Sequence, residues 1–327
     1  MCSYNGRLLE LKQEKEYFSK LHDLTNEMLN DNHDSTFKEV FAAVYEEFTK
    51  EHGKAPCDFV WFVTGSAGRK EQGIISDQDH GMIFQEDEPA NQVYFSALGK
   101  LVSDALNTVG YPYCEGNVMS SNHIWCKSFA GWKEQLYKWM KIENWESIRY
   151  LQIFYDSRGL IGNEKLVQDL KGVIHDFRQE HPALLVRFLN NVMRIKKGVG
   201  IFGQFFVERS GAHRGSLHMK NTLYLPYVNS IRLLAIKEGI IATSTLERIA
   251  ELKNRNVYES LMKEYETYFR RILLLRIVSF HDATDYSDVH FLNINKLTKE
   301  ERAEVKHLLR KGIKLYQQVK RLIEKGC

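Results

Sequence analysis

Residues 59–84, FVWFVTGSAGRKEQGIISDQDHGMIF, place a short glycine-rich turn between two apolar segments. The segment 58–63 before the turn is short, β-branched and aromatic, which is typical of a buried β-strand. The segment 80–84 after it has the character of the end of a second strand. Two strands joined by this turn predict a sheet in the first half of the chain.

Helical patterns flank these strands. Apolar residues recur at helical spacing within residues 7–52 and again within 92–108, and this alternation with strands over 55–160 favours an α/β or α+β domain. From about residue 163 onward the pattern is almost wholly helical. Ser244 with Glu247, and Thr298 with Glu301, fit the capping-box pattern of helix starts. The last segment carries an apolar stripe typical of a helix in a bundle.

The expected fold is therefore α+β, with a small mixed sheet flanked by helices and followed by an all-α bundle. At roughly 100–200 residues per domain, 327 residues suggest about two domains. We expect N-terminal helices over 1–55 that pack on a core domain over 56–178, and a helical domain over 179–327. The boundary is placed near 178–185, where charged residues and a proline interrupt two helical patterns.

Composition excludes several classes of protein. With 45 basic and 42 acidic side chains, the net charge of +3 gives no electrostatic case for binding nucleic acid or a membrane surface. The five cysteines are odd in number and scattered, which favours reduced thiols, and the spacing of Cys114, His123 and Cys126 matches no common zinc pattern. The start of the chain lacks a signal-peptide core, and no apolar run approaches the ~20 residues of a membrane span. We expect a cytoplasmic protein.

The turn between the strands has the chemistry of a phosphate-binding loop. Gly65 permits backbone conformations that other residues resist, and exposed amides together with the Ser66 hydroxyl can hold phosphate oxygens. Arg69 could add a charge-assisted contact. The turn lacks the Lys-Ser/Thr ending of a P-loop. A Gly-Ser pair alone is usually only a turn, so the prediction depends on the residues that come after it in the chain.

A pair of aspartates lies next along the chain. Asp77 and Asp79, at positions i and i+2 of an expected strand, would project from the same face. Two carboxylates held this close repel each other unless a cation lies between them. Mg²⁺, or Mn²⁺ in its place, suits two carboxylates plus substrate phosphates, and two such ions could activate an attacking hydroxyl and stabilise a leaving pyrophosphate.

The ordered combination Gly65-Ser66-x-x-Arg69-x-Glu71…Ser76-Asp77-x-Asp79 resembles the signature of the nucleotidyltransferase superfamily that includes DNA polymerase beta. It is most similar to the uridylyltransferases and adenylyltransferases that modify proteins in bacterial nitrogen control. More narrowly, the chain from about residue 30 to its end resembles a family of predicted nucleotidyltransferases of unknown function. Members of that family are often fused to CBS or cyclic-nucleotide-binding domains. The supporting stretches include GYPYCEGNVMSSNHIW (110–125), IFYDSRGLIGNEKLVQDL (153–170) and HMKNTLYLPYVNSIRLLA (218–235).

The resemblance implies roles for particular residues. Gly65 and Ser66 would grip a nucleoside triphosphate, with Arg69 as a further contact, and Asp77 and Asp79 would bind Mg²⁺. Enzymes of the superfamily commonly use a third carboxylate, often as the base for the incoming hydroxyl.

The third carboxylate is not fixed by the sequence. Asp156, in FYDSR, matches a place where related sequences carry an acid followed by an arginine, although a structural pairing of Asp156 with Arg158 explains the segment equally well. The competing acids are Glu115, Glu143 and Glu146. Lys220 matches a segment that in relatives joins the helical domain to the active-site cleft, where it could reach a phosphate.

These residues are compatible with two functions. The first is a metal-dependent nucleotidyltransferase, uridylyltransferase- or adenylyltransferase-like, that acts in signalling on a protein or small-molecule acceptor. The second is a catalytically silent module that binds nucleoside triphosphate and metal. Paired metal carboxylates favour the enzyme, and the lack of an assigned third acid favours the module. The sequence does not name the nucleotide, the acceptor or the oligomeric state.

Overall fold

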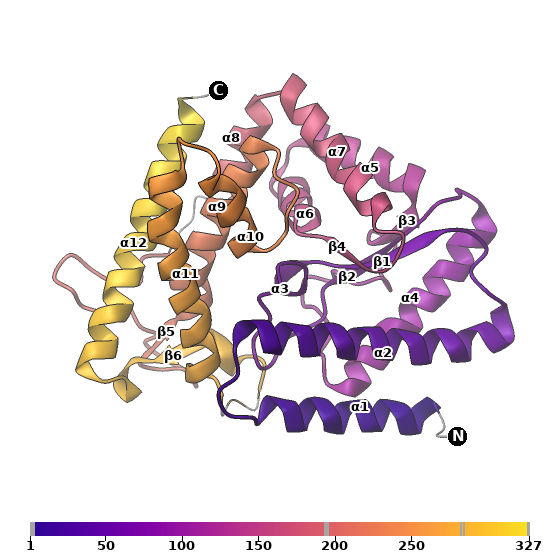
Figure 1. Cartoon of the computed structure of the whole chain (residues 1–327), viewed down its shortest axis with the longest axis horizontal. Coiled ribbons are helices and arrows are strands. Elements are labelled where there is room, and N and C mark those ends of the chain that lie inside the picture. The colour runs from indigo at the N-terminus through magenta and orange to yellow at the C-terminus, as the bar shows by residue number, and fades with distance from the viewer. Residues whose placement is uncertain (1–3, 193–195, 282, 284, 326–327) are drawn as a thin grey trace. The chain divides into compact units, whose positions relative to one another are not determined.

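The structure is a computed structural model that describes residues 4–192, 196–281, 283 and 285–325. These residues form two compact units, Met1–Phe177 and Arg178–Cys327 (Figure 1), and each is described by itself. The first unit combines helices with a small mixed sheet, and the second is mainly helical. The predicted fold class is confirmed.

The sheet of the first unit has the strand order β3-β2-β1-β4. β1 (Phe59–Val63) pairs antiparallel with both β2 (His80–Phe84) and β4 (Arg158–Gly162), whereas β3 (Cys126–Ser128) pairs parallel with β2. β1 and β2 are the two strands expected from the apolar segments. The glycine turn therefore lies in the connection between two neighbouring strands, at the end where Val63 of β1 pairs with His80 of β2.

β1 is buried on both faces, which explains why its sequence is apolar without alternation. On one face the Trp61 ring lies 5.1 Å from the ring of Phe41. On the other face Phe62 makes edge-to-face contacts with Trp132 at 5.7 Å and Phe154 at 5.9 Å between ring centroids. The sheet is thus the middle layer of the unit.

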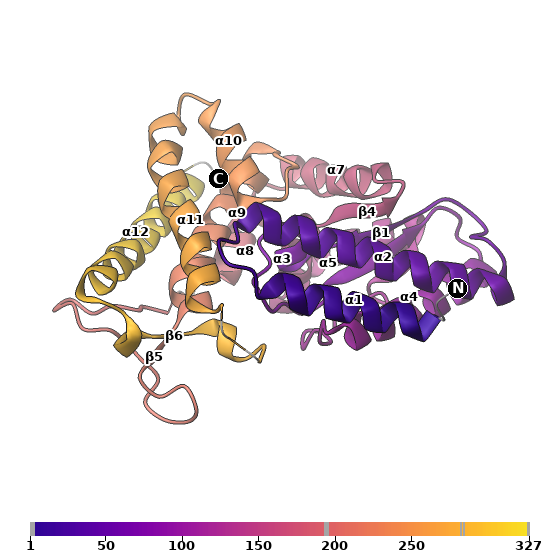
Figure 2. The same ribbon diagram turned by 60° about the horizontal axis from the view of Figure 1, so that its bottom comes forward.

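Helices cover both faces of this sheet (Figure 1). α2 (Asn26–His52) and α4 (Pro89–Val109) pack on one face, and α1 (Tyr4–Ser19) packs on these two helices, side by side with α2 (Figure 2). α5 (Phe129–Ile142), α6 (Trp145–Tyr155) and α7 (Lys165–Glu180) lie on the other face. The helical prediction for 7–52 is confirmed, with a break before Thr25, whose hydroxyl caps α2 by accepting from the amide of Met28.

The α-helices described for the second unit are α8 (Ala183–Asn191), α9 (Leu225–Glu238), α10 (Thr245–Lys253), α11 (Glu259–Ser279) and α12 (Lys299–Glu324). α9 is apolar almost all round, as expected for a central helix. Gly312 in α12 lies against the Tyr227 ring of α9, where a Cβ would come within 2.8 Å of the ring. The Tyr227 hydroxyl donates to the Leu308 carbonyl at 2.7 Å. Ser244 and Thr298 are confirmed as N-caps, since each accepts from the third amide of its helix. The full capping box is confirmed for Thr298 with Glu301, whereas for Ser244 with Glu247 only the serine half is formed.

The expectation of an almost wholly helical second half is wrong in one region. Residues 196–218 run without a helix into β5 (Ser216–His218), which pairs antiparallel with β6 (Phe291–Asn293). Short helical turns flank these strands: η1 (Lys220–Tyr224), η2 (Asp288–His290) and η3 (Ile294–Lys296). The physical reason is a series of glycines in 196–218, three of which, Gly203, Gly211 and Gly215, have positive φ and so cannot continue a helix.

None of the described helices combines the length and the apolar character needed to cross a membrane.

Candidate functional site

The glycine turn comes directly after β1. Thr64 is extended, and α3 (Gly65–Gly68) is a single helical turn. Gly65 has φ +57°, and a Cβ on it would lie 2.1 Å from Oδ2 of Asp79. Both the backbone conformation and the close approach of the carboxylate therefore require glycine here. Ser66 lies nearby, with its Oγ 3.4 Å from Oγ of Ser76.

Asp77 and Asp79 lie just before β2 rather than within a strand, which corrects the sequence-based expectation. Only Gln78 between them forms a bridge, to Tyr113. The Asp79 carbonyl accepts from the amide of Thr64 at 2.9 Å, which fixes the acidic segment beside the turn. A strand would have continued here, but the ladder changes partner at this point, because the Gln78 amide donates to the Pro112 carbonyl at 3.2 Å.

Gln78 anchors the acidic segment from below. Its side chain is fully buried, and its amide donates to the carbonyls of Ser103 at 3.1 Å and Tyr111 at 2.9 Å. Its Oε1 accepts from Nε2 of His80 at 2.8 Å. In an extended segment neighbouring side chains point in opposite directions, so a buried Gln78 directs Asp77 and Asp79 to the other side. Sequence reasoning missed this anchor, although a glutamine between two aspartates was visible.

His80 is held as a neutral ring. Its Nδ1 lies within hydrogen-bond distance of two groups that can only donate, the Trp61 Nε1–H and the Ser120 amide, both at 3.2 Å. Nδ1 must therefore accept, and Nε2 carries the proton that is donated to Gln78. Burial lowers the pKa of His80 to about 3.

His33 of α2 is the second buried histidine of this unit. Its Nε2–H donates to the carbonyl of Gly73 at 3.0 Å, and its Nδ1 accepts from the hydroxyl of Tyr111 at 2.8 Å. Burial, opposed by the Gly73 contact and reinforced by Lys15, lowers the pKa of His33 to about 4. His33 therefore ties α2 to the segment between the glycine turn and the aspartates.

Acid should destabilise the first unit through these two rings. Below pH 6.5 the histidines of the unfolded chain bind protons that His33 and His80 do not bind in the fold. The free energy of unfolding thus falls as pH drops toward their folded pKa values, by up to about 1.4 kcal/mol per pH unit for each ring. We expect His33→Gln and His80→Gln each to flatten the slope of stability between pH 6 and pH 5. Urea unfolding followed by tryptophan fluorescence measures it.

The matched control is His22→Gln, which removes an exposed histidine of the same unit. The readout belongs to this unit, since all five tryptophans lie within residues 61–145. An unchanged slope in both buried variants would contradict neutral rings in the fold.

Asp77, Asp79 and Cys114 form a group whose ligand atoms lie within 4.8 Å of one another. Within the part of the chain that the structure describes, no other such group of three is present. Burial, and then the neighbouring Asp79 carboxylate, raises the pKa of the Cys114 thiol well above its usual range. The thiol is therefore protonated and donates a hydrogen bond to Asp79. Sequence reasoning had grouped Cys114 with His123 and Cys126 instead.

The donor set fits a hard divalent cation. Two half-buried carboxylates supply the oxygen ligands that Mg²⁺ and Mn²⁺ prefer, whereas a protonated thiol is a poor ligand for either ion. The protein therefore has residues that could hold a divalent metal ion beside Gly65 and Ser66.

Arg69 lies inside the protein with two carboxylates. It is 5% exposed, its Nη1 donates to Oδ2 of Asp156 at 2.7 Å, and its Nε donates to Oε2 of Glu71 at 2.8 Å. Both acids are buried. Gly68 lies on the backbone of Asp156, where a Cβ would come within 2.0 Å of the carbonyl oxygen. The residue that ends α6, Asp156, thus packs directly against the glycine turn.

The predicted third carboxylates differ in burial. Asp156 is fully buried, Glu115 and Glu146 are exposed, and Glu143 is intermediate. The Asp156–Arg158 pairing considered from the sequence is not the one formed, because Arg158 pairs with Asp34 of α2.

Lys220, the remaining predicted ligand, belongs to the second unit. It begins η1, a π-helical turn, and its Nζ lies 3.5 Å from Nε2 of His290. Burial, followed by the charge of Lys220, lowers the pKa of His290 to about 3, so the ring is neutral beside the ammonium group. The sequence pair His281–Asp282 is interpreted as structural, because the other ligands of a phosphohydrolase site are missing around it. His281 is described, but Asp282 lies outside the described residues.

Comparison with known families defines the class of protein. The family model described as "Putative nucleotidyltransferase DUF294" matches residues 12–146, and "Putative nucleotidyltransferase substrate binding domain" matches residues 182–323. A search of curated proteins found no match. The class of reaction indicated by the family is nucleotidyl transfer, with a nucleotide as substrate. The chain belongs to this DUF294 family, which is the family suspected from the sequence.

Proposed function

We propose that the protein is a metal-dependent nucleotidyltransferase that moves a nucleoside monophosphate from a nucleoside triphosphate to a hydroxyl of a protein or small-molecule acceptor. Pyrophosphate is released, and the role is in signalling or regulation. One observation supports this above the others: the Asp79 carboxylate lies so close to the backbone of the turn at Gly65 that any larger residue there would clash with it. A phosphate-binding turn and a metal-binding pair are thereby held together.

This arrangement gives each residue a role. Gly65 and Ser66 bind the triphosphate, and Asp77 and Asp79 hold Mg²⁺ or Mn²⁺. When bound, the ion neutralises phosphate charge and lowers the barrier to attack by a hydroxyl. The buried Gln78 and His80 keep the two carboxylates aimed at the ion.

In the transfer, the acceptor oxygen forms a bond to the α-phosphorus while the bond to the bridging oxygen of the β-phosphate breaks. Pyrophosphate takes the electron pair of that bond, and the hydroxyl proton passes to a carboxylate. Because Asp156 already pairs with Arg69, we propose that Arg69 and Asp156 position the turn from within instead of contacting phosphate or metal. The base is then sought among Glu115, Glu143 and Glu146.

We propose that residues 1–55 and 56–178 together form the catalytic part and that residues 179–327 hold the acceptor. The description of the second family as a substrate binding domain supports this division. The basic pair of Lys220 and neutral His290 offers two hydrogen-bonding groups for a phosphate of either substrate.

The test is incubation of the full chain and Mg²⁺ with each of the four α-labelled nucleoside triphosphates and a cell extract. We expect one triphosphate to give a labelled acceptor together with pyrophosphate, and Asp77→Asn with Asp79→Asn to give neither. The four triphosphates control for one another, because they differ only in the base.

The alternative is a silent module that binds nucleotide and metal without transfer. The burial of Asp156 against Arg69 favours it, because the candidate third acid is engaged within the protein. Metal-dependent binding without labelled acceptor or pyrophosphate, for all four triphosphates, would establish the module and reject the enzyme.

A further inference from the structure

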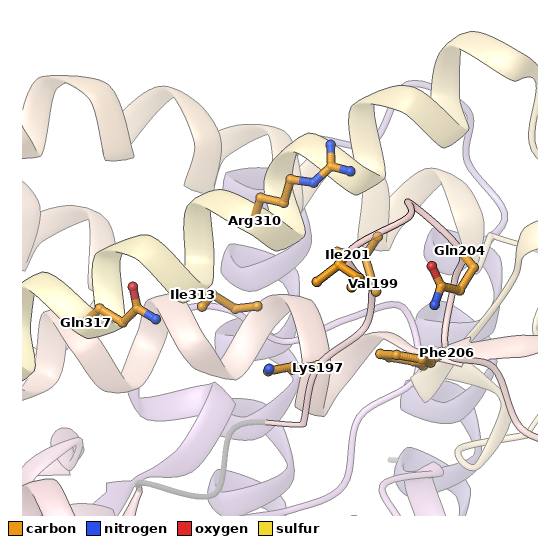
Figure 3. Close-up of a pocket in the computed structure, with 9 residues that line it drawn as sticks. Lys197, Val199, Ile201, Gln204, Phe206, Arg310, Ile313 and Gln317 are labelled. Carbon is orange, nitrogen blue, oxygen red and sulfur yellow. The ribbon is translucent and has the colours of Figure 1, made fainter.

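The second unit contains a pocket whose lining includes none of the residues that were given a role in the proposed reaction. It has a volume of about 440 Å³, within the range of small-molecule sites. One wall is α12 and the other is the segment 197–206 (Figure 3). Its lining residues are Lys197, Val199, Gly200, Ile201, Gln204, Phe206, Arg310, Ile313 and Gln317.

The segment 197–206 forms a hairpin with a fixed shape. The amide of Gly200 donates to the carbonyl of Gln204 at 2.8 Å, and the amide of Phe206 donates to the carbonyl of Gly198 at 2.9 Å. A Cβ on Gly200 would lie 2.3 Å from Nε2 of Gln204, so glycine leaves room for that amide. Gly203, with φ +80°, makes the turn. The backbone of this wall is therefore held in one shape by the two hydrogen bonds and by glycine at positions 200 and 203.

The hairpin is attached to α12. A Cβ on Gly198 would come within 2.7 Å of Cδ2 of Leu309, so the backbone packs directly on that side chain. The ammonium group of Lys306 lies 5.0 Å from the centre of the Phe205 ring, a cation–π distance. Since both contacts join the same two elements, the pocket between them is part of the fold of this unit.

The charges of the lining are all of one sign. Lys197 and Arg310 are the charged members, no acid lines the pocket, and the two cations lie at opposite edges in Figure 3. Neither forms an ion pair with any residue in 4–192, 196–281, 283 or 285–325. Two glutamine amides add neutral hydrogen-bonding groups.

The remaining lining is mainly apolar, and two of its side chains are unusually accessible. Ile201 is 90% exposed and Phe206 is 48% exposed, although both are residues that usually bury most of their surface. Ile313 of α12 and Val199 of the hairpin complete this apolar lining (Figure 3). An apolar surface between two such cations has the chemistry that recognises an apolar body carrying a negative group.

We propose that this pocket binds a small organic anion with an apolar or aromatic body and a phosphate or carboxylate group. The body lies on Ile313, Val199 and Phe206, and the anionic group is held at Lys197 or Arg310. The lining includes none of Gly65, Ser66, Asp77, Asp79 or Lys220, so binding at this site can be tested without the proposed transfer reaction.

Calorimetric titration of the full chain with 1-naphthyl phosphate tests this site. The double variant Asp77→Asn/Asp79→Asn, without metal, serves as the background in which the nucleotide site is weakened. We expect 1-naphthyl phosphate to bind more tightly than either 1-naphthol or inorganic phosphate, since only the first has both parts. Parallel titration with 1-naphthaleneacetate, which carries a carboxylate in place of the phosphate, distinguishes a phosphate site from a carboxylate site.

Adding Lys197→Gln with Arg310→Gln should weaken the binding of 1-naphthyl phosphate by about tenfold or more and leave that of 1-naphthol unchanged. The matched control is Lys314→Gln with Arg321→Gln, two exposed residues of α12 that do not line the pocket. It removes the same charge and should not alter binding. Equal affinity for 1-naphthol and 1-naphthyl phosphate, or no effect of Lys197→Gln/Arg310→Gln, would reject the proposal.

Discussion

The double variant Asp77→Asn/Asp79→Asn should lose the thermal stabilisation that Mg²⁺ or Mn²⁺ with a nucleoside triphosphate gives to the wild-type protein. A ligand that binds only the folded state stabilises it by about 2.7 kcal/mol when its concentration is one hundred times Kd. For a unit of this size, such a gain raises Tm by several degrees. Asparagine keeps the shape of aspartate but removes the charges that hold the cation, so the gain should disappear.

We also expect a result for the same variant in the absence of ligand. Asp77 and Asp79 lie close enough to repel each other, and the Cys114 thiol is uncharged beside them. Removing both charges relieves that repulsion, and the asparagine side-chain oxygen can still accept from the Cys114 thiol, so the variant should remain folded without ligand and give a measurable Tm. Loss of stabilisation by ligand can then not be attributed to a damaged fold.

Differential scanning fluorimetry on the intrinsic tryptophans measures both effects in the unit that carries the site, since all five tryptophans lie there. The control is Asp31→Asn with Asp169→Asn, two exposed aspartates of the same unit that give the same change in net charge. It should keep the full shift. A shift that persists in the variant Asp77→Asn/Asp79→Asn would reject the assignment of the metal site.

The sequence predicted the parts of this site that depend on local order. β1 and the turn are adjacent in the chain, and β2 begins directly after Asp79, so an apolar strand, glycine and paired acids in this order suffice to place them together. The same holds for the caps at Ser244 and Thr298, which involve residues three positions apart. In each of these the interacting residues are near neighbours in sequence, so a short pattern contains the information.

Contacts between distant residues were not predicted. Arg69 and Asp156 are 87 positions apart, and no short pattern shows that one would be buried on the other. Cys114 reaches the aspartates only because the segment after α4 returns to pair with Gln78. The strands β3, β5 and β6 have three residues each, which is too short for alternation of side chains to be recognised.

Arg69→Met should strongly destabilise the first unit. Methionine keeps an unbranched apolar chain of similar length but removes the guanidinium that donates to both Asp156 and Glu71. The two carboxylates would remain buried without this partner, and breaking a buried ion pair from one side costs about 3–5 kcal/mol. Because Gly68 lies on the backbone of Asp156, the loss should also disturb the glycine turn.

Urea unfolding followed by tryptophan fluorescence measures the cost for this unit alone. The matched control is Arg149→Met, in α6, where the arginine side chain is partly exposed and lies 6.0 Å from the Tyr150 ring. Arg149→Met should lower the free energy of unfolding much less than Arg69→Met, since the contact described for Arg149 is an aromatic ring and not a buried carboxylate. The triple variant Arg69→Met/Glu71→Gln/Asp156→Asn also removes the two buried negative charges that Arg69 contacts, and it should recover a large part of the stability.

These variants also separate the two roles considered for Arg69. If Arg69 and Asp156 position the turn, the triple variant should recover stability and keep metal-dependent binding of nucleoside triphosphate, because Gly65, Ser66, Asp77 and Asp79 are intact. If Asp156 is a metal ligand or Arg69 a phosphate ligand, binding is lost even when stability returns. If Arg69→Met caused no loss of stability, the buried ion pairs would be contradicted. That result would instead fit an arginine that points to solvent and contacts only the ligand, because exposed ion pairs contribute little to folding.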